Sequence, residues 1–89
     1  MSEKHDVELP AIEFAKSHGW YFVRKVQWIG RRNAPDRLFL RNGRHIWVEF
    51  KDEGEEANPG QLREHNRMRK HGAEVYVIDR LEQAYEIFA

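Results

Sequence analysis

One stretch of the sequence decides the fold. It reads Arg37-Leu38-Phe39-Leu40-Arg41-Asn42-Gly43-Arg44-His45-Ile46-Trp47-Val48-Glu49-Phe50-Lys51. Aromatic and branched apolar residues occur in both halves, which favours β-strands. The dipeptide Asn42-Gly43 favours a two-residue turn in which both central residues have positive φ. We therefore predict a β-hairpin with strands from Arg37 to Arg41 and from Arg44 to Lys51.

The length of this turn also predicts which residues face each other. With a two-residue loop, Asp36 lies opposite Glu49, and two carboxylates meet on one face of the sheet. Lys51 projects to the same face as Glu49, because side chains alternate along a strand. A three-residue turn would slip the pairing by one residue and move every side chain to the other face.

Two facing carboxylates need a compensating cation or a raised pKa, because like charges opposed on a β-ladder are destabilising. A divalent metal ion supplies that cation, and Mg²⁺ prefers hard oxygen ligands. Such a metal activates water and neutralises charge on a phosphodiester, and Lys51 would orient the water or stabilise the developing charge. The alternative is that Glu49 and Lys51 are ordinary exposed strand residues and Asp36 is a turn residue after Pro35. We favour the site, since the alternative does not explain the shared register.

The elements before the hairpin are less regular. An apolar stripe predicts a helix that runs to about His18, with Gly19 as its stop. Pro10 limits this helix, since proline is tolerated in the first turn unless the helix kinks. Trp20 to Trp28 reads as a first strand, followed by a loop from Gly30 to Pro35.

The elements after the hairpin carry clear start signals. After an acidic loop, Asn58-Pro59 is an N-cap followed by proline at the first helical position, and that helix ends at Gly72. Glu74 to Ile78 reads as a short buried strand. Asp79 with Glu82 resembles a capping box that opens a last helix through Phe88. The order α-β-β-β-α-β-α predicts an α/β fold with a mixed sheet flanked by helices.

Composition narrows the class of protein. The 89 residues predict a single domain, 1–89, with one modest core. The formal net charge is zero, so any affinity for DNA must come from local clustering. The absence of cysteine excludes a disulfide framework, a thiolate zinc site and a cysteine nucleophile. No apolar run is long enough for a signal peptide or a membrane span, so we expect a cytoplasmic protein. A homodimer would add stability to so small a core.

Several motifs together resemble one family. The segments are Gly30-Arg31-Arg32-Asn33-Ala34-Pro35-Asp36-Arg37-Leu38-Phe39-Leu40, Trp47-Val48-Glu49-Phe50-Lys51, Asn58-Pro59-Gly60-Gln61 and Gly72-Ala73-Glu74-Val75. They resemble the stand-alone VRR-NUC (virus-type replication-repair nuclease) domains of phage genomes, within the PD-(D/E)xK nuclease superfamily. The resemblance covers nearly the whole chain. It implies a restriction-endonuclease-like αβββαβ core with a short C-terminal helix.

The resemblance also implies roles for individual residues. Asp36, Glu49 and the backbone carbonyl of Phe50 would bind the metal ion, Mg²⁺ or Mn²⁺. Lys51 would be the catalytic lysine, and Gln61 would sit beside the site. Ala34 stands where the family usually has glycine before the proline-aspartate pair.

Glu8 matches the acidic residue that such nucleases often carry on the first helix. If that helix reaches back beyond Glu8, the residue shares a face with Ala11, Ile12 and Ala15 and points inward. If the helix starts at Pro10, Glu8 is a solvated acid near the helix N-terminus.

Basic residues gather in the first half of the chain. Arg31, Arg32 and Arg37 are the candidates for DNA phosphate contacts, and the alternative for each arginine is a solvated surface position. We do not predict a metal site from the five histidines, most of which are expected at the surface. His65, one turn after Gln61, is expected to pack at the edge of the core.

Taken together, the sequence predicts a metal-dependent, structure-selective DNA endonuclease that hydrolyses phosphodiesters. The resemblance implies branched DNA as substrate, with a four-way junction cut by a homodimer as the leading case, and no membrane or organic cofactor. A flap or nicking nuclease is a second possibility on the same fold. Another is a non-catalytic DNA-binding or assembly module that has kept the fold.

Overall fold

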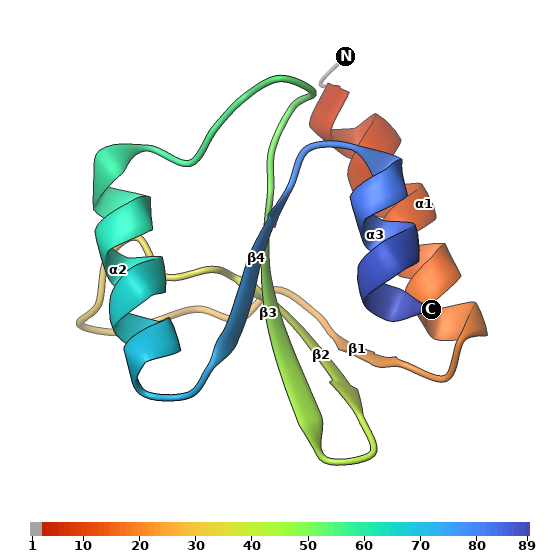
Figure 1. Cartoon of the computed structure of the whole chain (residues 1–89), viewed down its shortest axis with the longest axis horizontal. Coiled ribbons are helices and arrows are strands. Elements are labelled where there is room, and N and C mark those ends of the chain that lie inside the picture. Colours follow the sequence, from red (N-terminus) through yellow and green to blue (C-terminus); the bar gives the residue numbers. More distant parts are fainter. Residues whose placement is uncertain (1–2) are drawn as a thin grey trace.

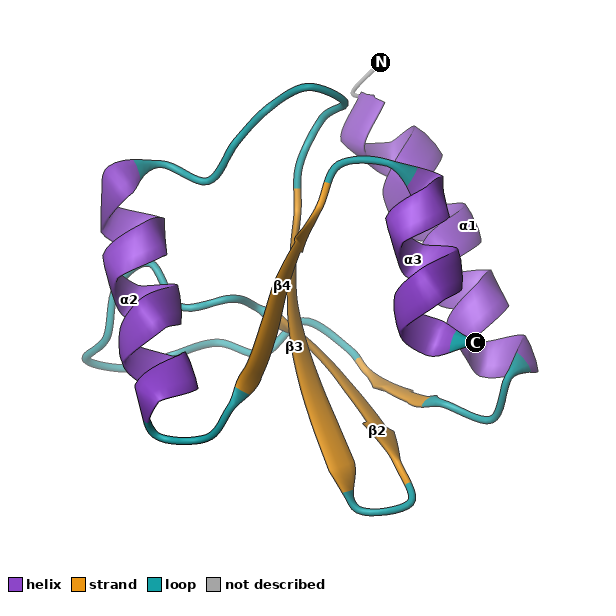
Figure 2. Cartoon of the chain, viewed as in Figure 1, coloured by secondary structure: helices purple, strands orange, loops and turns teal. Residues whose placement is uncertain are grey.

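The computed structural model describes residues 3–89, and the side chains of residues 6–22 and 24–89. The elements follow the predicted order: α1 (Glu3–Ser17), β1 (Tyr21–Val23), β2 (Arg37–Arg41), β3 (Arg44–Phe50), α2 (Pro59–Lys70), β4 (Glu74–Ile78) and α3 (Leu81–Phe88). Figure 2 shows the helices on both sides of the strands. This arrangement confirms the α/β fold class. No helix within residues 3–89 combines the length and apolar character needed to span a membrane.

The four strands form one mixed sheet in the order β1-β2-β3-β4. The pairs β1–β2 and β2–β3 are antiparallel, and β4 runs parallel to β3. In the hairpin, Arg41 faces Arg44 and Arg37 faces Val48, which is the predicted two-residue register. Asn42 and Gly43 have φ values of 48° and 83°, as the turn requires.

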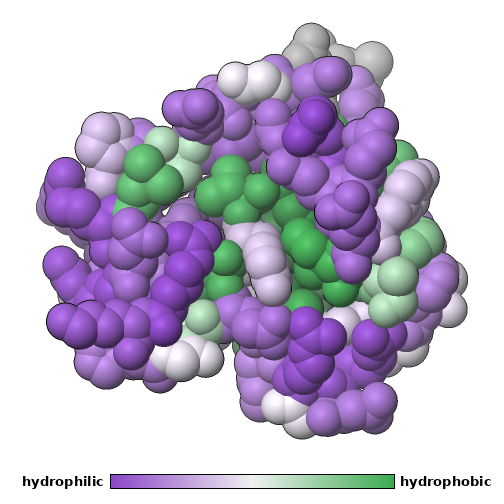
Figure 3. All heavy atoms as spheres, in the orientation of Figure 1, coloured by the Kyte–Doolittle hydropathy of each residue, from purple (hydrophilic) through white to green (hydrophobic). Residues whose placement is uncertain are grey.

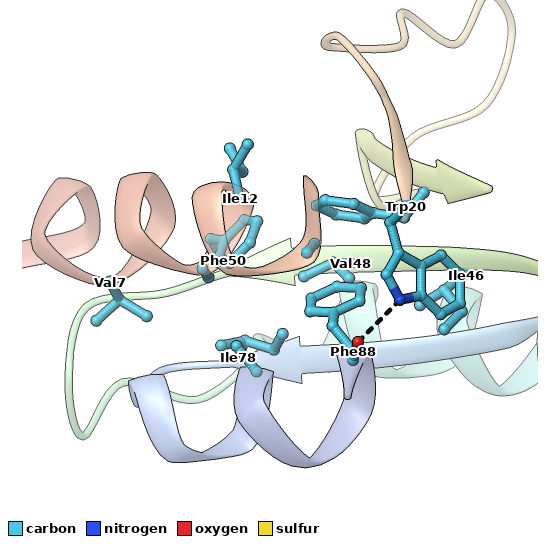
Figure 4. Packing of buried hydrophobic residues seen from close by; sticks show 12 residues of the cluster. Val7, Ile12, Trp20, Ile46, Val48, Phe50, Ile78 and Phe88 are labelled. Carbon is cyan, nitrogen blue, oxygen red and sulfur yellow. Dashed lines mark hydrogen bonds between the residues drawn. The ribbon is translucent and has the colours of Figure 1, made fainter. Parts of the chain in front are cut away.

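The sheet separates two unequal helical layers, with α2 on one face and the pair α1 and α3 on the other (Figure 1). The core lies between the sheet and α1 and α3 (Figure 4). Trp20 closes one end of this core, where its Nε1 donates a hydrogen bond of 3.0 Å to the carbonyl of Phe88. In Figure 3, apolar atoms gather in the middle of the visible face, whereas α2 is covered mostly by hydrophilic residues.

Helix α1 begins before its proline, so the alternative in which it starts at Pro10 is wrong. Pro10 lies inside the helix and is exposed. The carbonyl that loses its partner belongs to Asp6, one turn earlier and also exposed, so water can satisfy it. On the opposite side, Val7, Ala11 and Ala15 pack into the core. Burial of this stripe holds the first turns in place.

The first strand is shorter than predicted, because β1 covers Tyr21–Val23 rather than Trp20 to Trp28. A strand needs a partner, and β2 begins only at Arg37. Beyond β1 the chain keeps one sheet-like hydrogen bond, from the Val26 amide to the Asp36 carbonyl at 2.8 Å. Trp28 then anchors the loop, with its Nε1 bonded to the Pro35 carbonyl at 2.9 Å.

The last helix also starts differently from the prediction. Asp79 and Glu82 do not form its capping box. Helix α3 begins at Leu81, one residue later than such a box requires. The Gln83 side chain accepts hydrogen bonds from the amides of Asp79 and Arg80, at 2.9 and 3.1 Å. The side chain of Asp79 is used elsewhere, because its Oδ2 accepts the amide of Gly54 at 2.9 Å.

Candidate functional site

The predicted acidic residues lie where β2 begins and β3 ends. Asp36 directly precedes β2, and Glu49 is the penultimate residue of β3. Because Arg37 pairs with Val48, the next step along the ladder brings Asp36 toward Glu49. Alternation puts both on the face of the sheet that α2 covers. Glu49 is buried, and the Asp36 side chain is 28% exposed, so this end of the sheet opens to solvent at Asp36.

Arg37 ties this end of the sheet to α1. By alternation it lies on the face of Val48, toward α1. Its Nε donates a hydrogen bond of 2.6 Å to Glu8, and its Nη1 lies 3.0 Å from the Asp36 carboxylate. Glu8 is buried within α1, and a buried carboxylate requires a charged or hydrogen-bonding partner. One guanidinium therefore balances two acidic residues from different layers.

Glu8 thus has the inward orientation that a long first helix predicts. The structure places Arg37, named from the sequence as a phosphate contact, among the acidic residues instead of in the exposed loop. Lys25 lies at the open side of the same group, with its Nζ 4.0 Å from Asp36.

Lys51 follows β3 directly. Its amide donates a hydrogen bond of 2.9 Å to the Ile78 carbonyl in β4. The Phe50–Lys51 peptide is trans, so the Phe50 carbonyl points away from β4, toward the β2 side where Asp36 lies. The Phe50 side chain is buried in the core, so only its backbone is available to the site.

Gln61 has a structural role in the first turn of α2. Its side-chain Oε1 accepts the Asn58 amide at 3.0 Å, and its own amide donates to Asn58 Oδ1 at 2.9 Å. This is the capping box of α2. The sequence predicted Asn58 as the N-cap but not the reciprocal use of the Gln61 side chain.

His65 lies one turn further along α2 and is fully buried. Neither of its ring nitrogens has a hydrogen-bond partner among the described residues. Burial lowers the pKa of His65, and the positive charges of Arg69 and Lys51 lower this pKa further, whereas Glu64 raises it. His65 is therefore neutral near pH 7, and it packs more deeply than the core-edge position expected from the sequence.

A basic hollow of about 400 Å³ lies beside this end of the sheet. Its arginines are Arg31 and Arg32 of the loop, joined by Arg63 and Arg67 of α2. Buried Glu64 accepts two hydrogen bonds from Arg31, at 3.0 and 2.9 Å, and one from Arg67 at 2.9 Å. These α2 residues were not predicted from the sequence, although their spacing of three and four places them on one helical face.

The residues at the sheet end fit a hard metal ion in donor type. The Asp36 and Glu49 carboxylates and the Phe50 carbonyl are oxygen donors, which suit Mg²⁺ and Mn²⁺. Among the side chains of residues 6–22 and 24–89, however, no three histidine, aspartate or glutamate side chains lie close enough together to hold a metal ion. The fit therefore depends on two carboxylates and a backbone oxygen. Beside them, Arg37 is hydrogen-bonded to Glu8 and forms an ion pair with Asp36.

Comparisons with known proteins point to one family. Among models of protein families, none matches the chain. A phage protein named "Putative nuclease p44", from Acyrthosiphon pisum secondary endosymbiont phage 1, is 53% identical in a 65-residue alignment that covers 64% of this chain and 70% of the phage protein. A solved structure described as a "VRR_NUC domain" has a TM-score of 0.85 and 37% identity, over 98% of this chain and 95% of that one.

Both similarities include much more of the chain than the short acidic signature. The match to the solved structure extends over nearly all the helices and strands, at an identity that supports family membership as well as fold. The phage protein adds the name of an activity. The chain has the restriction-endonuclease-like fold and belongs to the VRR-NUC family of nucleases.

Proposed function

We propose that the protein is a DNA endonuclease that depends on Mg²⁺ or Mn²⁺. The observation that supports this most directly is the hairpin register, which directs Asp36 and Glu49 to one end of the sheet beside Lys51. Asp36, Glu49 and the Phe50 carbonyl would hold the metal ion. When bound, the ion supplies an activated water and neutralises charge on the phosphodiester.

Lys51 would orient the attacking water or stabilise negative charge as it develops on the phosphate. Arg37 would act within the site and not as a DNA phosphate contact, because its guanidinium lies against Glu8 and Asp36. It would hold these acids in place and offset their repulsion. Glu8 and Gln61 would support the site from α1 and α2, while Arg31 and Arg32 would hold DNA phosphates.

For the substrate we propose branched DNA, with a four-way junction cut by a homodimer as the leading case. Two copies related by a two-fold axis would present two sites to the two sides of a junction. The small core supports this assembly, because dimer formation would bury more apolar surface. A place for the contact is the hollow of about 620 Å³ at the β4 edge of the sheet, whose lining includes the apolar residues Ala57, Leu62 and Val77 and acidic residues of the loop before α2. We propose a cytoplasmic enzyme without an organic cofactor.

The test is cleavage of labelled four-way junction, flap and linear duplex DNA with Mg²⁺, Mn²⁺ or EDTA. Lys51→Ala and Asp36→Asn should each reduce the rate by at least about a hundredfold. The matched controls are Lys70→Ala and Asp6→Asn, which change the same residue types at exposed helical positions. Both controls should cut like the native chain.

The substrates separate the competing functions. Preferred cutting of the four-way junction supports the proposed junction-cutting enzyme, whereas preferred cutting of flaps or duplexes supports a flap or nicking nuclease. If no DNA is cut with either metal while DNA still binds, the protein is a binding module and the enzyme proposal is wrong.

A further inference from the structure

The basic hollow is a built structure, and we name it the arginine cleft: Arg31, Arg32, Arg63 and Arg67 around Glu64. Glu64 is only 4% exposed and accepts hydrogen bonds from Arg31 and Arg67. Each of these arginines has five N–H donors and uses only its Nη1 on Glu64. The carboxylate therefore fixes two guanidinium groups and leaves most of their donors for a ligand.

The other two arginines of the cleft, Arg32 and Arg63, have even more N–H donors available for a ligand. Among the residues that the structure describes, the Arg32 and Arg63 side chains have no hydrogen bond or ion pair. Four arginines and one glutamate leave three unbalanced positive charges in the cleft, within a chain whose formal net charge is zero. A local excess of this kind attracts a polyanion even when the whole molecule is neutral.

Close packing holds the two walls of the cleft together. A Cβ at Gly60 of α2 would lie 2.7 Å from the Asn33 side chain, so the helix and the loop approach closely because residue 60 is glycine. Asn33 itself has a positive φ of 66°, a left-handed conformation that asparagine tolerates in turns. The loop arginines and the helix arginines therefore face the same space.

The cleft also continues to the candidate active site. A second hollow of about 470 Å³ is lined by Asp36 and shares Arg31 and Asn33 with the arginine cleft. In duplex DNA the phosphates of one strand recur about every 3.4 Å along the axis. A strand whose scissile phosphate lies at Asp36 would therefore bring neighbouring phosphates toward these arginines.

We propose that the arginine cleft binds the phosphodiester backbone next to the bond that is cut, and that Glu64 is a positioning residue that orients Arg31 and Arg67 for this contact. This proposal rests on the proposed nuclease function, because that function places the scissile phosphate of the DNA strand at Asp36. It adds Arg63 and Arg67 to the DNA-binding surface. Recognition of this kind positions DNA without reading its sequence.

The first test measures binding of a fluorescent DNA duplex and a four-way junction to the native chain in EDTA, so that cleavage does not interfere. The variant Arg63→Ala/Arg67→Ala changes two exposed side chains of α2. We expect its Kd to rise about tenfold, and the slope of log Kd against log salt concentration to fall by about 2, since two phosphate contacts are lost.

The matched control is Lys16→Ala/Arg80→Ala, which removes the same charge from exposed residues of α1 and the start of α3, across the sheet from α2 (Figure 1). Its salt slope should equal that of the native chain. If the cleft variant retains the native Kd and salt slope, the cleft proposal is wrong. In that case the nuclease proposal still stands if the native chain cuts DNA. If instead the cleft variant binds DNA less tightly but the native chain cuts no DNA, only the nuclease proposal is wrong.

A second variant tests Glu64 by the sign of its effect. Glu64→Gln makes the chain more positive, so binding would strengthen if only charge mattered. We expect the reverse, a Kd at least about threefold higher with a smaller salt slope, because Arg31 and Arg67 lose their shared anchor. Circular dichroism and thermal unfolding identify the folded fraction used in the titration. Tighter binding by folded Glu64→Gln would overturn the positioning role.

Discussion

Arg37 joins two layers of the molecule through one side chain. Its guanidinium contacts Glu8 in α1 and Asp36 at the start of β2, and it is only 16% exposed. Removing one partner of a buried ion pair leaves the other charge without compensation, which commonly costs about 3 to 5 kcal/mol. Arg37→Ala should therefore lower the free energy of unfolding by about 3 kcal/mol, measured by urea denaturation.

The control for this prediction is another strand arginine with a carboxylate partner. Arg44 in β3 donates hydrogen bonds to Glu74 in β4 from Nε and Nη2, at 3.1 and 2.8 Å, but the Arg44 and Glu74 side chains are 47% and 34% exposed. Exposed pairs contribute about 0.2 to 1 kcal/mol. Arg44→Ala should therefore cost less than about 1 kcal/mol. Equal losses for the two variants would show that burial does not distinguish these two ion pairs.

In the first turn of α2, Gln61 could act in two ways, as a capping residue or as part of the proposed site. This residue completes the capping box with Asn58, and the sequence resemblance also puts it beside the active site. Asn58→Ala and Gln61→Ala should each cost about 1 kcal/mol of stability, because each removes half of the box. If Gln61 also serves the proposed site, only Gln61→Ala should lower kcat, by about tenfold or more.

Unfolding curves and single-turnover cleavage on the same preparations separate these effects. Asn58→Ala is the matched control, since it disturbs the same helix end and keeps the glutamine. If both variants lose cleavage equally, in proportion to lost stability, Gln61 is a capping residue only.

The sequence predicts elements well where their causes are local. The hairpin followed from Asn42-Gly43 and the strand residues on either side, because the turn alone selects the register. The start of α2 followed from Asn58-Pro59 in the same way. The short β1 was not predictable in this manner, since its length depends on where β2 begins, many residues later.

Tertiary packing explains the other differences. Helix α1 includes Pro10 because burial of its apolar side stabilises the helix. The local sequence shows only the cost of proline and not this stabilisation. Glu64 reads in the sequence as one more charged residue of a polar helix, yet it is buried beneath two arginines. The sequence named Asp36, Glu49 and Lys51 from register alone, but the partners of Glu8 appear only in three dimensions.

For the whole molecule, the lowered pKa of His65 makes the stability of the fold depend on pH. Its pKa in the folded chain lies below the ordinary 6.5, mainly because burial disfavours the charged ring. The unfolded chain therefore binds more protons between these two pKa values, and stability rises with pH there. The contribution of neutral His65 is fully present above about pH 6.5 to 7 and is lost as the pH falls below it.

Urea denaturation of the native chain and of His65→Leu, between about pH 5 and pH 8, measures this effect. The difference in unfolding free energy between the two proteins should shift in favour of the variant as the pH falls, because leucine does not titrate. His71→Leu changes an exposed histidine and should run parallel to the native curve. A native curve parallel to that of His65→Leu would exclude His65 as the titrating group.

The balanced charges of the molecule have a colloidal consequence. The sequence pI is about 7.0, yet the loop 52–56 carries four acidic residues while the arginine cleft carries a positive excess. Near neutral pH no net charge keeps two copies apart, and unlike patches on neighbouring molecules attract each other. Solubility of the pure protein should accordingly pass through a minimum near pH 7. Moderate salt should raise it by salting-in, whereas DNA that fills the cleft would give every particle the same sign and keep the complex dispersed.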